Sequence, residues 1–271
     1  MSSSRRRSSP GRPSVPVGSQ LPSPWADGAL DVAGLSRQGP RAENQDAWMV
    51  EPRWGVMALA DGCGGEGVHG GFAANAVVAS VRTSVRSGRH QGPVKALWDA
   101  AADKLRGDLA RVGWSAATTL IVVQLHPLET QVVWSGDSGL FTLSPRGTFQ
   151  RRTRFHNLAG VGLDAGQMTE DEYRGDRRRR ILLAHLSKEP KAEYEVLSTP
   201  GLQPGEVALV LTDGLFDPLG SERIGDLLRR ARADGASAVQ MLEGVMEAAE
   251  TEGLKDNATR VVVYRRGPPS A

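Results

Sequence analysis

The stretch LADGCGGEG, residues 59–67, places an aspartate and four glycines directly after the apolar run 56–60. The apolar run predicts a buried strand, so Asp61 is expected where that strand leaves the core. Glycine-rich backbone lets a chain turn sharply and approach a ligand closely. The stretch therefore predicts a site that holds a cation or a phosphate, or else only a tight turn.

The segments on either side of this stretch predict an antiparallel α+β fold. Helical patterns at 70–87 and 92–110 follow it, with apolar residues recurring at spacings of three and four. Hairpin-spaced strands come next, which does not fit the strict alternation of a parallel α/β fold. The expected strands are at 29–39, 46–50, 54–61, 117–125, 130–139, 140–149, 193–201, 206–214 and 258–266, with further helices near 221–233 and at 237–252.

The glycines also match the G-x-G-x-x-G pattern of a dinucleotide-binding loop, from Gly62 to Gly67. Two features disfavour that reading. Asp61 and Glu66 would place negative charge beside a pyrophosphate, and the acid expected about twenty residues on is missing from VVASVRTSVRSG, residues 77–88. A dinucleotide enzyme stays an alternative that thermal stabilisation by NAD or NADP would reveal.

Four more aspartates stand at the ends of predicted strands. VMALADG and VALVLTDG place Asp61 and Asp213 alike, and Asp137 lies at the exit of TQVVWSGD. Asp46 and Asp256 stand at strand entrances. Because the exit of one antiparallel strand and the entrance of its neighbour share an edge, we expect five aspartates at one rim. Each Asp-Gly pair taken alone is also typical of a hairpin turn.

Several carboxylates packed at one rim repel one another unless cations lie between them. Hard divalent ions such as Mg²⁺ or Mn²⁺ prefer such oxygen ligands. The five histidines have no zinc-motif spacing, and the single cysteine, Cys63, excludes an internal disulfide. A pair of ions about 3.5–4 Å apart can activate a water for attack on a phosphoryl group. The rim therefore predicts metal-assisted phosphate chemistry.

The first residues differ from the rest of the chain. Residues 1–24 are rich in Ser, Arg and Pro, and they carry four arginines without which acids outnumber bases, despite a formal net charge of +2. Such a composition predicts a disordered tail. We expect one domain over 25–267 and a short tail at 268–271. No apolar run suits a secretion signal or a membrane span, so a cytoplasmic location is expected.

A cluster of arginines, Arg174 and Arg177 to Arg180, surrounds Asp176 in the segment 151–190. A solvated surface is favoured over a patch that binds acidic partners. No aromatic residues are interleaved with these arginines, so the cluster does not predict nucleic-acid binding.

Six motifs in order carry a resemblance to a known family: GPRAENQDAW, ALADGCGGEGVHGGFAA, AATTL, WSGDSG, LVLTDGLFD and KDNATRVVV. Over about residues 28–266 the chain resembles the metal-dependent protein serine/threonine phosphatases of the PP2C (PPM) type. The resemblance implies a four-layer α-β-β-α sandwich, with two central antiparallel sheets flanked by helix pairs and the metals at one rim.

The resemblance also implies roles for single residues. Asp61 would bridge two Mn²⁺ or Mg²⁺ ions, the Gly62 carbonyl would ligate one, and Asp213 and Asp256 would complete the other. Asp46 would act on the second ion, and Asp137 would help to hold a third, weaker ion. Arg41 would bind the substrate phosphate through its planar fork.

The implied activity is hydrolysis of phosphoserine and phosphothreonine in proteins, by a monomer whose partners are phosphoproteins and a serine/threonine kinase or its targets. Two departures keep open a pseudophosphatase that binds phosphoproteins without turnover: Gln45 for glutamate and Gly139 for arginine. A third, WSAAT at residues 114–118 in place of the usual Gly-Thr pairing, implies reduced activity or altered substrate choice. Oxidation of Cys63 is a further hypothesis, disfavoured because neighbouring carboxylates oppose the reactive thiolate.

Overall fold

The computed structural model describes residues 30–63, 69–189 and 192–267. The predicted tails 1–24 and 268–271 and the glycines of the stretch from residue 64 onward lie outside these ranges. The extent of the domain, 25–267, stays a prediction.

The strands form two antiparallel sheets. One sheet has the order β1-β11-β10-β7-β8, and the other has the order β2-β3-β5-β6-β9 with the short β4 paired to β3. Their bounds are Leu30–Arg37 (β1), Asp46–Glu51 (β2), Val56–Cys63 (β3), Ala117–Thr118 (β4), Leu120–Leu125 (β5), Glu129–Ser135 (β6), Gly139–Leu143 (β7), Phe149–Arg151 (β8), Glu195–Pro200 (β9), Val207–Leu211 (β10) and Ala258–Arg265 (β11).

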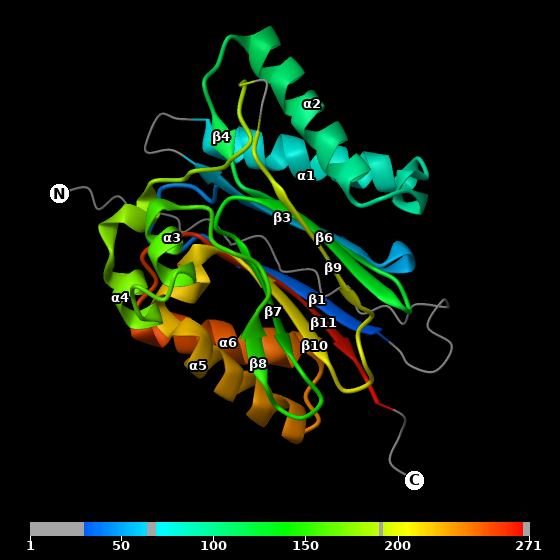
Figure 1. Cartoon of the computed structure of the whole chain (residues 1–271), viewed down its shortest axis with the longest axis vertical. Coiled ribbons are helices and arrows are strands. Elements are labelled where there is room, and N and C mark those ends of the chain that lie inside the picture. Colours follow the sequence, from blue (N-terminus) through cyan, green and yellow to red (C-terminus); the bar gives the residue numbers. More distant parts are fainter. Residues whose placement is uncertain (1–29, 64–68, 190–191, 268–271) are drawn as a thin grey trace, which may run out of the picture.

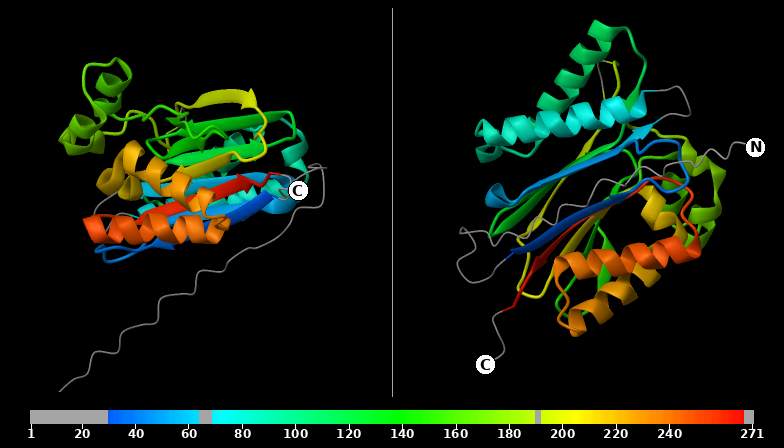
Figure 2. Two further views of the ribbon diagram at one scale, coloured as in Figure 1. Left: turned by 90° about the horizontal axis from the view of Figure 1, so that it is seen from below. Right: turned by 180° about the vertical axis from the view of Figure 1, so that it is seen from behind.

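Two helix pairs cover the outer faces of the sheets (Figures 1 and 2). Helices α1 (Gly70–Arg86) and α2 (Lys95–Val112) pack on the sheet that contains β3 and β5. Helices α5 (Asp213–Ala233) and α6 (Ala238–Glu252) pack on the sheet that contains β10 and β11. The predicted four-layer α-β-β-α sandwich is confirmed.

The apolar strands follow from this layering. Every residue of β5 is buried. Its Ile121 and Val123 face the core between the sheets, whereas Leu120 and Val122 face the helices α1 and α2. A strand at the centre of a sandwich has two buried faces, so its sequence is apolar without alternation.

Shorter elements lie at one end of the sandwich. They are α3 (Leu158–Asp164), α4 (Glu170–Gly175) and the 3₁₀ turn η3 (Arg177–Arg180), and Figure 1 shows α3 and α4 beyond the ends of the sheets. Two further 3₁₀ turns are η1 (Pro52–Trp54) and η2 (Arg89–Gln91). Between residues 151 and 189 the chain thus contains three short helical elements, and η3 carries the clustered arginines 177–180.

The clearest differences from the expected elements concern one strand and one helix. The strand expected at 140–149 is a hairpin, because the chain turns at Gly147, whose φ is +91° and whose N–H donates to the Ser144 carbonyl. Helix α5 begins at Asp213 rather than near 221, with a break at Gly220, where φ is +69°.

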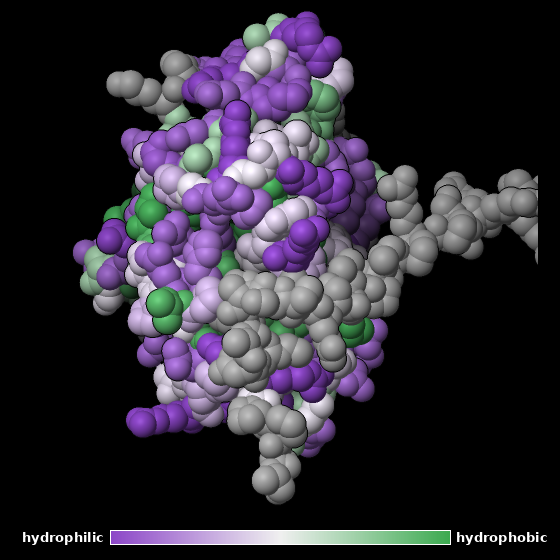
Figure 3. Space-filling view, turned by 90° about the vertical axis from the view of Figure 1, so that its right-hand side faces the viewer, coloured by the Kyte–Doolittle hydropathy of each residue, from purple (hydrophilic) through white to green (hydrophobic). Residues whose placement is uncertain are grey.

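The surface over α2, at the top of Figure 3, is mainly hydrophilic. In the described ranges, no helix combines the length and the apolar content that a membrane crossing needs.

Candidate metal centre

A cavity of about 920 Å³ opens at the rim where the two sheets meet, and Asp61, Asp137, Asp213 and Asp256 line it. The fifth predicted aspartate, Asp46, is only 8% exposed. The structure thus brings the predicted residues together from distant parts of the chain.

Strand register positions the first two aspartates. Asp46 begins β2 and is paired with Asp61 of β3. Opposite residues of an antiparallel pair project to the same face with Cβ atoms about 5 Å apart. Both carboxylates therefore point to one side of their sheet.

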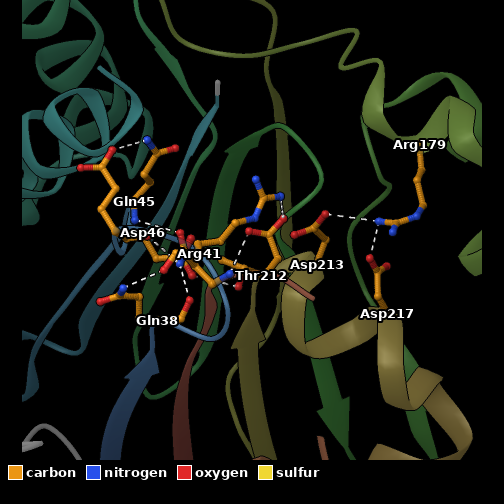
Figure 4. A network of polar contacts seen from close by, with 11 residues as sticks. Gln38, Arg41, Gln45, Asp46, Arg179, Thr212, Asp213 and Asp217 are labelled. Atoms are coloured by element: carbon orange, nitrogen blue, oxygen red, sulfur yellow. Dashed lines mark hydrogen bonds and ion pairs between the residues drawn. The ribbon is translucent and has the colours of Figure 1, made fainter. Parts of the chain in front are cut away.

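The second sheet supplies the other acids. Asp213 is the first residue of α5, two residues after the end of β10, and Asp256 lies two residues before β11. Thr212 joins the sheets, because its hydroxyl donates to Asp46 Oδ2 at 3.3 Å and accepts from the N–H of Thr259 at 3.0 Å (Figure 4). Asp137 lies in the turn between β6 and β7, where its Oδ2 accepts from Asn157 at 3.0 Å.

The electrostatics of the rim favour cations. Burial, opposed by a hydrogen bond from Thr259 and reinforced by the charges of Asp213 and Asp256, raises the pKa of Asp46 to about 7. Burial and the charge of Asp213 raise the pKa of Asp137 to about 7. Burial and then the charge of Asp46 raise the pKa of Asp61 well above its ordinary value. Cations at the rim would stabilise the ionised carboxylates.

The side chains fit hard divalent ions. Oδ1 of Asp46 and Oδ1 of Asp213 are buried and have no hydrogen-bond partner. Buried carboxylate oxygens are rarely left so, and the donors here are all oxygens, as Mg²⁺ and Mn²⁺ prefer. Within the described ranges, no three acidic, histidine or cysteine side chains already close on one point. The acidic side chains line the cavity, and bound ions would have to draw these carboxylates closer together.

Gly62 is required by packing at the end of β3. A Cβ at this position would lie 2.4 Å from the carbonyl oxygen of Gly70, at the start of α1. The close approach of strand and helix therefore explains one glycine of the stretch.

Arg41 stands at the mouth of the cavity. Its guanidinium is half exposed and pairs with Asp256 Oδ2 at 2.5 Å. Asn257 holds the surrounding loop, because its Nδ2 donates to the carbonyls of Gln38 and Glu43 and its Oδ1 accepts from the N–H of Gln45. The loop thus places Arg41 beside Asp256 in the lining of the cavity.

Sequence reasoning missed Asp217 and Arg179. Asp217 follows Asp213 by four residues in α5, so both lie on one face of the helix. Arg179 contacts both carboxylates (Figure 4). Arg179 and Arg180 both line the cavity. The i, i+4 spacing in DGLFD could have revealed Asp217 if α5 had been expected to begin at Asp213.

Three rings form an aromatic wall on another side of the cavity. His69 and Trp114 stack with centroids 3.5 Å apart, and Phe72 meets Trp114 edge-on at 5.3 Å. All three line the cavity, and Trp114 is 38% exposed. The wall offers apolar surface beside the acidic rim.

The chain is similar in sequence to known phosphatases. The family model described as protein phosphatase 2C matches residues 33–260. A serine/threonine phosphatase stp of Listeria welshimeri serovar 6b is 26% identical over 148 residues, which make up 55% of this chain and 56% of that protein. The chain thus spans about half the length of the curated relatives it matches.

Solved structures share the fold. The serine/threonine phosphatase PstP/Ppp of Mycobacterium tuberculosis has a TM-score of 0.76 and 23% identity, with 88% of this chain and 99% of that chain covered. The catalytic domain of PstP in complex with two manganese ions has a TM-score of 0.73 and 24% identity, with 88% and 98% covered. At these sequence identities the comparison shows that the fold is shared, and nothing more.

Proposed function

Because this chain belongs to the protein phosphatase 2C family, we propose that it hydrolyses phosphoserine and phosphothreonine in proteins with Mn²⁺ or Mg²⁺ as cofactor. The observation that carries the proposal is the acidic rim, in which the buried oxygens Asp46 Oδ1 and Asp213 Oδ1 have no partner. The structure of a related catalytic domain with two manganese ions supports the choice of metal.

The proposed ligands come from both sheets. Asp61 and the Gly62 carbonyl would hold ions from the β3 side, with Asp46 beside them. Asp213 and Asp256 would hold an ion from the α5 side, and Asp137 also lines the cavity. When bound, the ions would activate a water for in-line attack and offset the negative charge of the phosphoryl group.

Arg41 would receive the substrate phosphate. Its half-exposed guanidinium lines the cavity, and its fork can donate two parallel hydrogen bonds to a phosphate. The ion pair with Asp256 orients that fork before substrate arrives. Asn257, directly before β11, holds the loop that carries Arg41 through its hydrogen bonds to Gln38, Glu43 and Gln45. This loop would therefore position Arg41 for the phosphate.

The open cavity suits a side chain presented by another protein. The aromatic wall of His69, Phe72 and Trp114 provides apolar surface for residues that flank the phosphorylated one. A cytoplasmic location, a monomeric state and a kinase acting on the same targets stay predictions.

The decisive experiment compares hydrolysis of a phosphothreonine peptide and of p-nitrophenyl phosphate with Mn²⁺ and after EDTA. Asp213→Asn tests the rim, and Asp99→Asn is the matched control, because Asp99 lies on α2 in an exposed ion pair with Lys95. Turnover that needs both metal and Asp213 supports the proposal. Binding of Mn²⁺ by the folded protein without hydrolysis of either substrate would favour the pseudophosphatase.

A further inference from the structure

Arg179 of η3 reaches the acidic rim from outside the two sheets. Its Nη1 lies 3.4 Å from Asp213 Oδ2 and also pairs with Asp217 Oδ2 (Figure 4). The Arg179 side chain is only 16% exposed, which separates it from an ordinary surface arginine. One guanidinium thus contacts two carboxylates that stand one helical turn apart.

The backbone around Arg179 is anchored. Asp176 caps η3, because its Oδ1 accepts from the N–H of Arg178 at 2.8 Å. Arg174 of α4 donates to the carbonyls of Asp217 and Pro218 at 2.7 and 2.8 Å. These contacts fix η3 and α4 against the first turns of α5, so the position of Arg179 is built into the fold.

Glu170 completes this attachment. Its Oε1 accepts from the N–H of Ser221 at 2.5 Å, directly after the break in α5 at Gly220. Two residues of α4 therefore satisfy backbone groups on both sides of the break. The same contacts hold Asp217 on the face of α5 that meets Arg179.

The charges on this side of the cavity are unbalanced without Arg179. Asp137, Asp213 and Asp217 are three acids whose pKa values burial raises, and the positive charge of Arg179 opposes the rise at each of them. Oδ1 of Asp217, like that of Asp213, is buried without a partner. A positive charge at this place offsets the carboxylates, and Arg179 supplies one.

We propose that the guanidinium of Arg179 takes the place of a third divalent ion beside Asp137, Asp213 and Asp217, so that this chain holds two ions. The inference rests on the proposed function, because it assumes that the rim binds divalent metal. It differs from the expectation, drawn from family resemblance, that Asp137 helps to hold a third ion. The acid is present, but an arginine contacts the carboxylates that such an ion would need.

The test is a count of bound Mn²⁺ by native mass spectrometry and titration calorimetry, after EDTA treatment and dialysis. We expect two ions in the parent and a third, weaker one in Arg179→Gln, where the cationic side chain is lost. Arg179→Lys keeps the charge and should bind two. Arg180→Gln is the matched control, because Arg180 lines the same cavity without an ion pair to any residue in the described ranges.

The double variant Arg179→Gln/Asp137→Asn should return the count to two, since the third ion would lose a carboxylate ligand. Three ions in the parent would overturn the inference even if Arg179→Gln failed to fold. A count of two in folded Arg179→Gln would overturn it as well. Absence of any bound Mn²⁺ from the folded parent is a different result, because it removes the proposed function itself.

Discussion

Asp46 lies directly opposite Asp61 across the antiparallel pair of β2 and β3, at the rim of the cavity. Like charges at such positions destabilise a sheet. Burial is the main cause of the raised pKa values of both groups, and the charge of Asp46 adds to the rise at Asp61. In the metal-free protein the crowded carboxylates of the rim lower the free energy of unfolding. Divalent cations bound there would offset the negative charge.

Replacing one acid of the rim should separate activity from stability. We expect Asp61→Asn and Asp213→Asn each to lower turnover by at least about 100-fold, since each removes a charge that would hold the metal. In EDTA both variants should be at least as heat-stable as the parent, because crowding of like charges is relieved. The rise in Tm on adding Mn²⁺ should shrink. Turnover near that of the parent at limiting Mn²⁺ would contradict the assignment.

The metal-free protein should lose stability as pH rises. Asp46 and Asp137 have folded pKa values of about 7, above their ordinary values, so the folded state holds their protons more tightly than the unfolded state does. Their contribution is present below about pH 4 and is lost as pH rises through about 7. Added Mn²⁺ should raise Tm more at about pH 8 than at about pH 5.5, because it binds deprotonated carboxylates.

Thermal unfolding in EDTA across that pH range checks this expectation. The matched variant is Asp46→Asn, in which one of the titrating groups is gone and the decline with pH should be smaller. An equal decline in parent and variant would show that other groups set the pH dependence.

The approach of α5 to the segment before β11 predicts a severe effect of one methyl group. A Cβ at Gly214 would lie 1.9 Å from the carbonyl oxygen of Asn257, a backbone atom that cannot move freely. We expect Gly214→Ala to lower the free energy of unfolding by about 1–3 kcal/mol or more, as for overpacked cores. Because Asn257 follows Asp256, the affinity for Mn²⁺ should fall too.

Gly244→Ala is the control for that measurement. Gly244 lies within α6, and a Cβ there meets no atom within 4 Å. The change should stabilise the protein by roughly 0.5–1 kcal/mol, because alanine favours a helix interior. Denaturant unfolding of both variants decides the matter, and equal effects would refute the steric argument.

Cys63 should be unreactive. Burial, followed by the charges of Asp61 and Asp137, raises the pKa of its thiol well above the ordinary value. The thiolate is the reactive form, so alkylation by iodoacetamide should be at least ~10-fold slower in the folded protein than in urea. Cys63→Ser should keep the peroxide sensitivity of the parent, and a resistant variant would revive the redox hypothesis.

The sequence predicted the layers well because both helix pairs and the central strands have strong patterns. Helix α1 was expected at 70–87 and spans Gly70–Arg86, and β5 is apolar throughout because both its faces are covered. Such apolar patterns can be read from a short stretch of sequence, because they depend only on which faces of the element are buried. They do not depend on which other segments the element contacts.

The start of α5 could not be predicted in this way. Pro218 and Gly220 predict a turn, yet Arg174 and Glu170, more than forty residues earlier, satisfy the backbone around the break. For the same reason Arg179 was read as part of a solvated cluster. Its carboxylate partners become visible only when η3 lies against α5.

The pairing of β1 with β11 has a consequence for how the protein is made. Leu30 is paired with Arg265, and β11 is the neighbour that joins β1 to its sheet. Strand β1 therefore leaves the ribosome long before its partner exists, and contacts of such sequence separation form slowly. Until β11 emerges, β1 and β10 keep edges open to wrong pairing, and Asp256 has not yet reached the rim. The step that closes this sheet is thus also the step that completes the acidic rim, so a nascent chain should gain affinity for Mn²⁺ only at the end of folding.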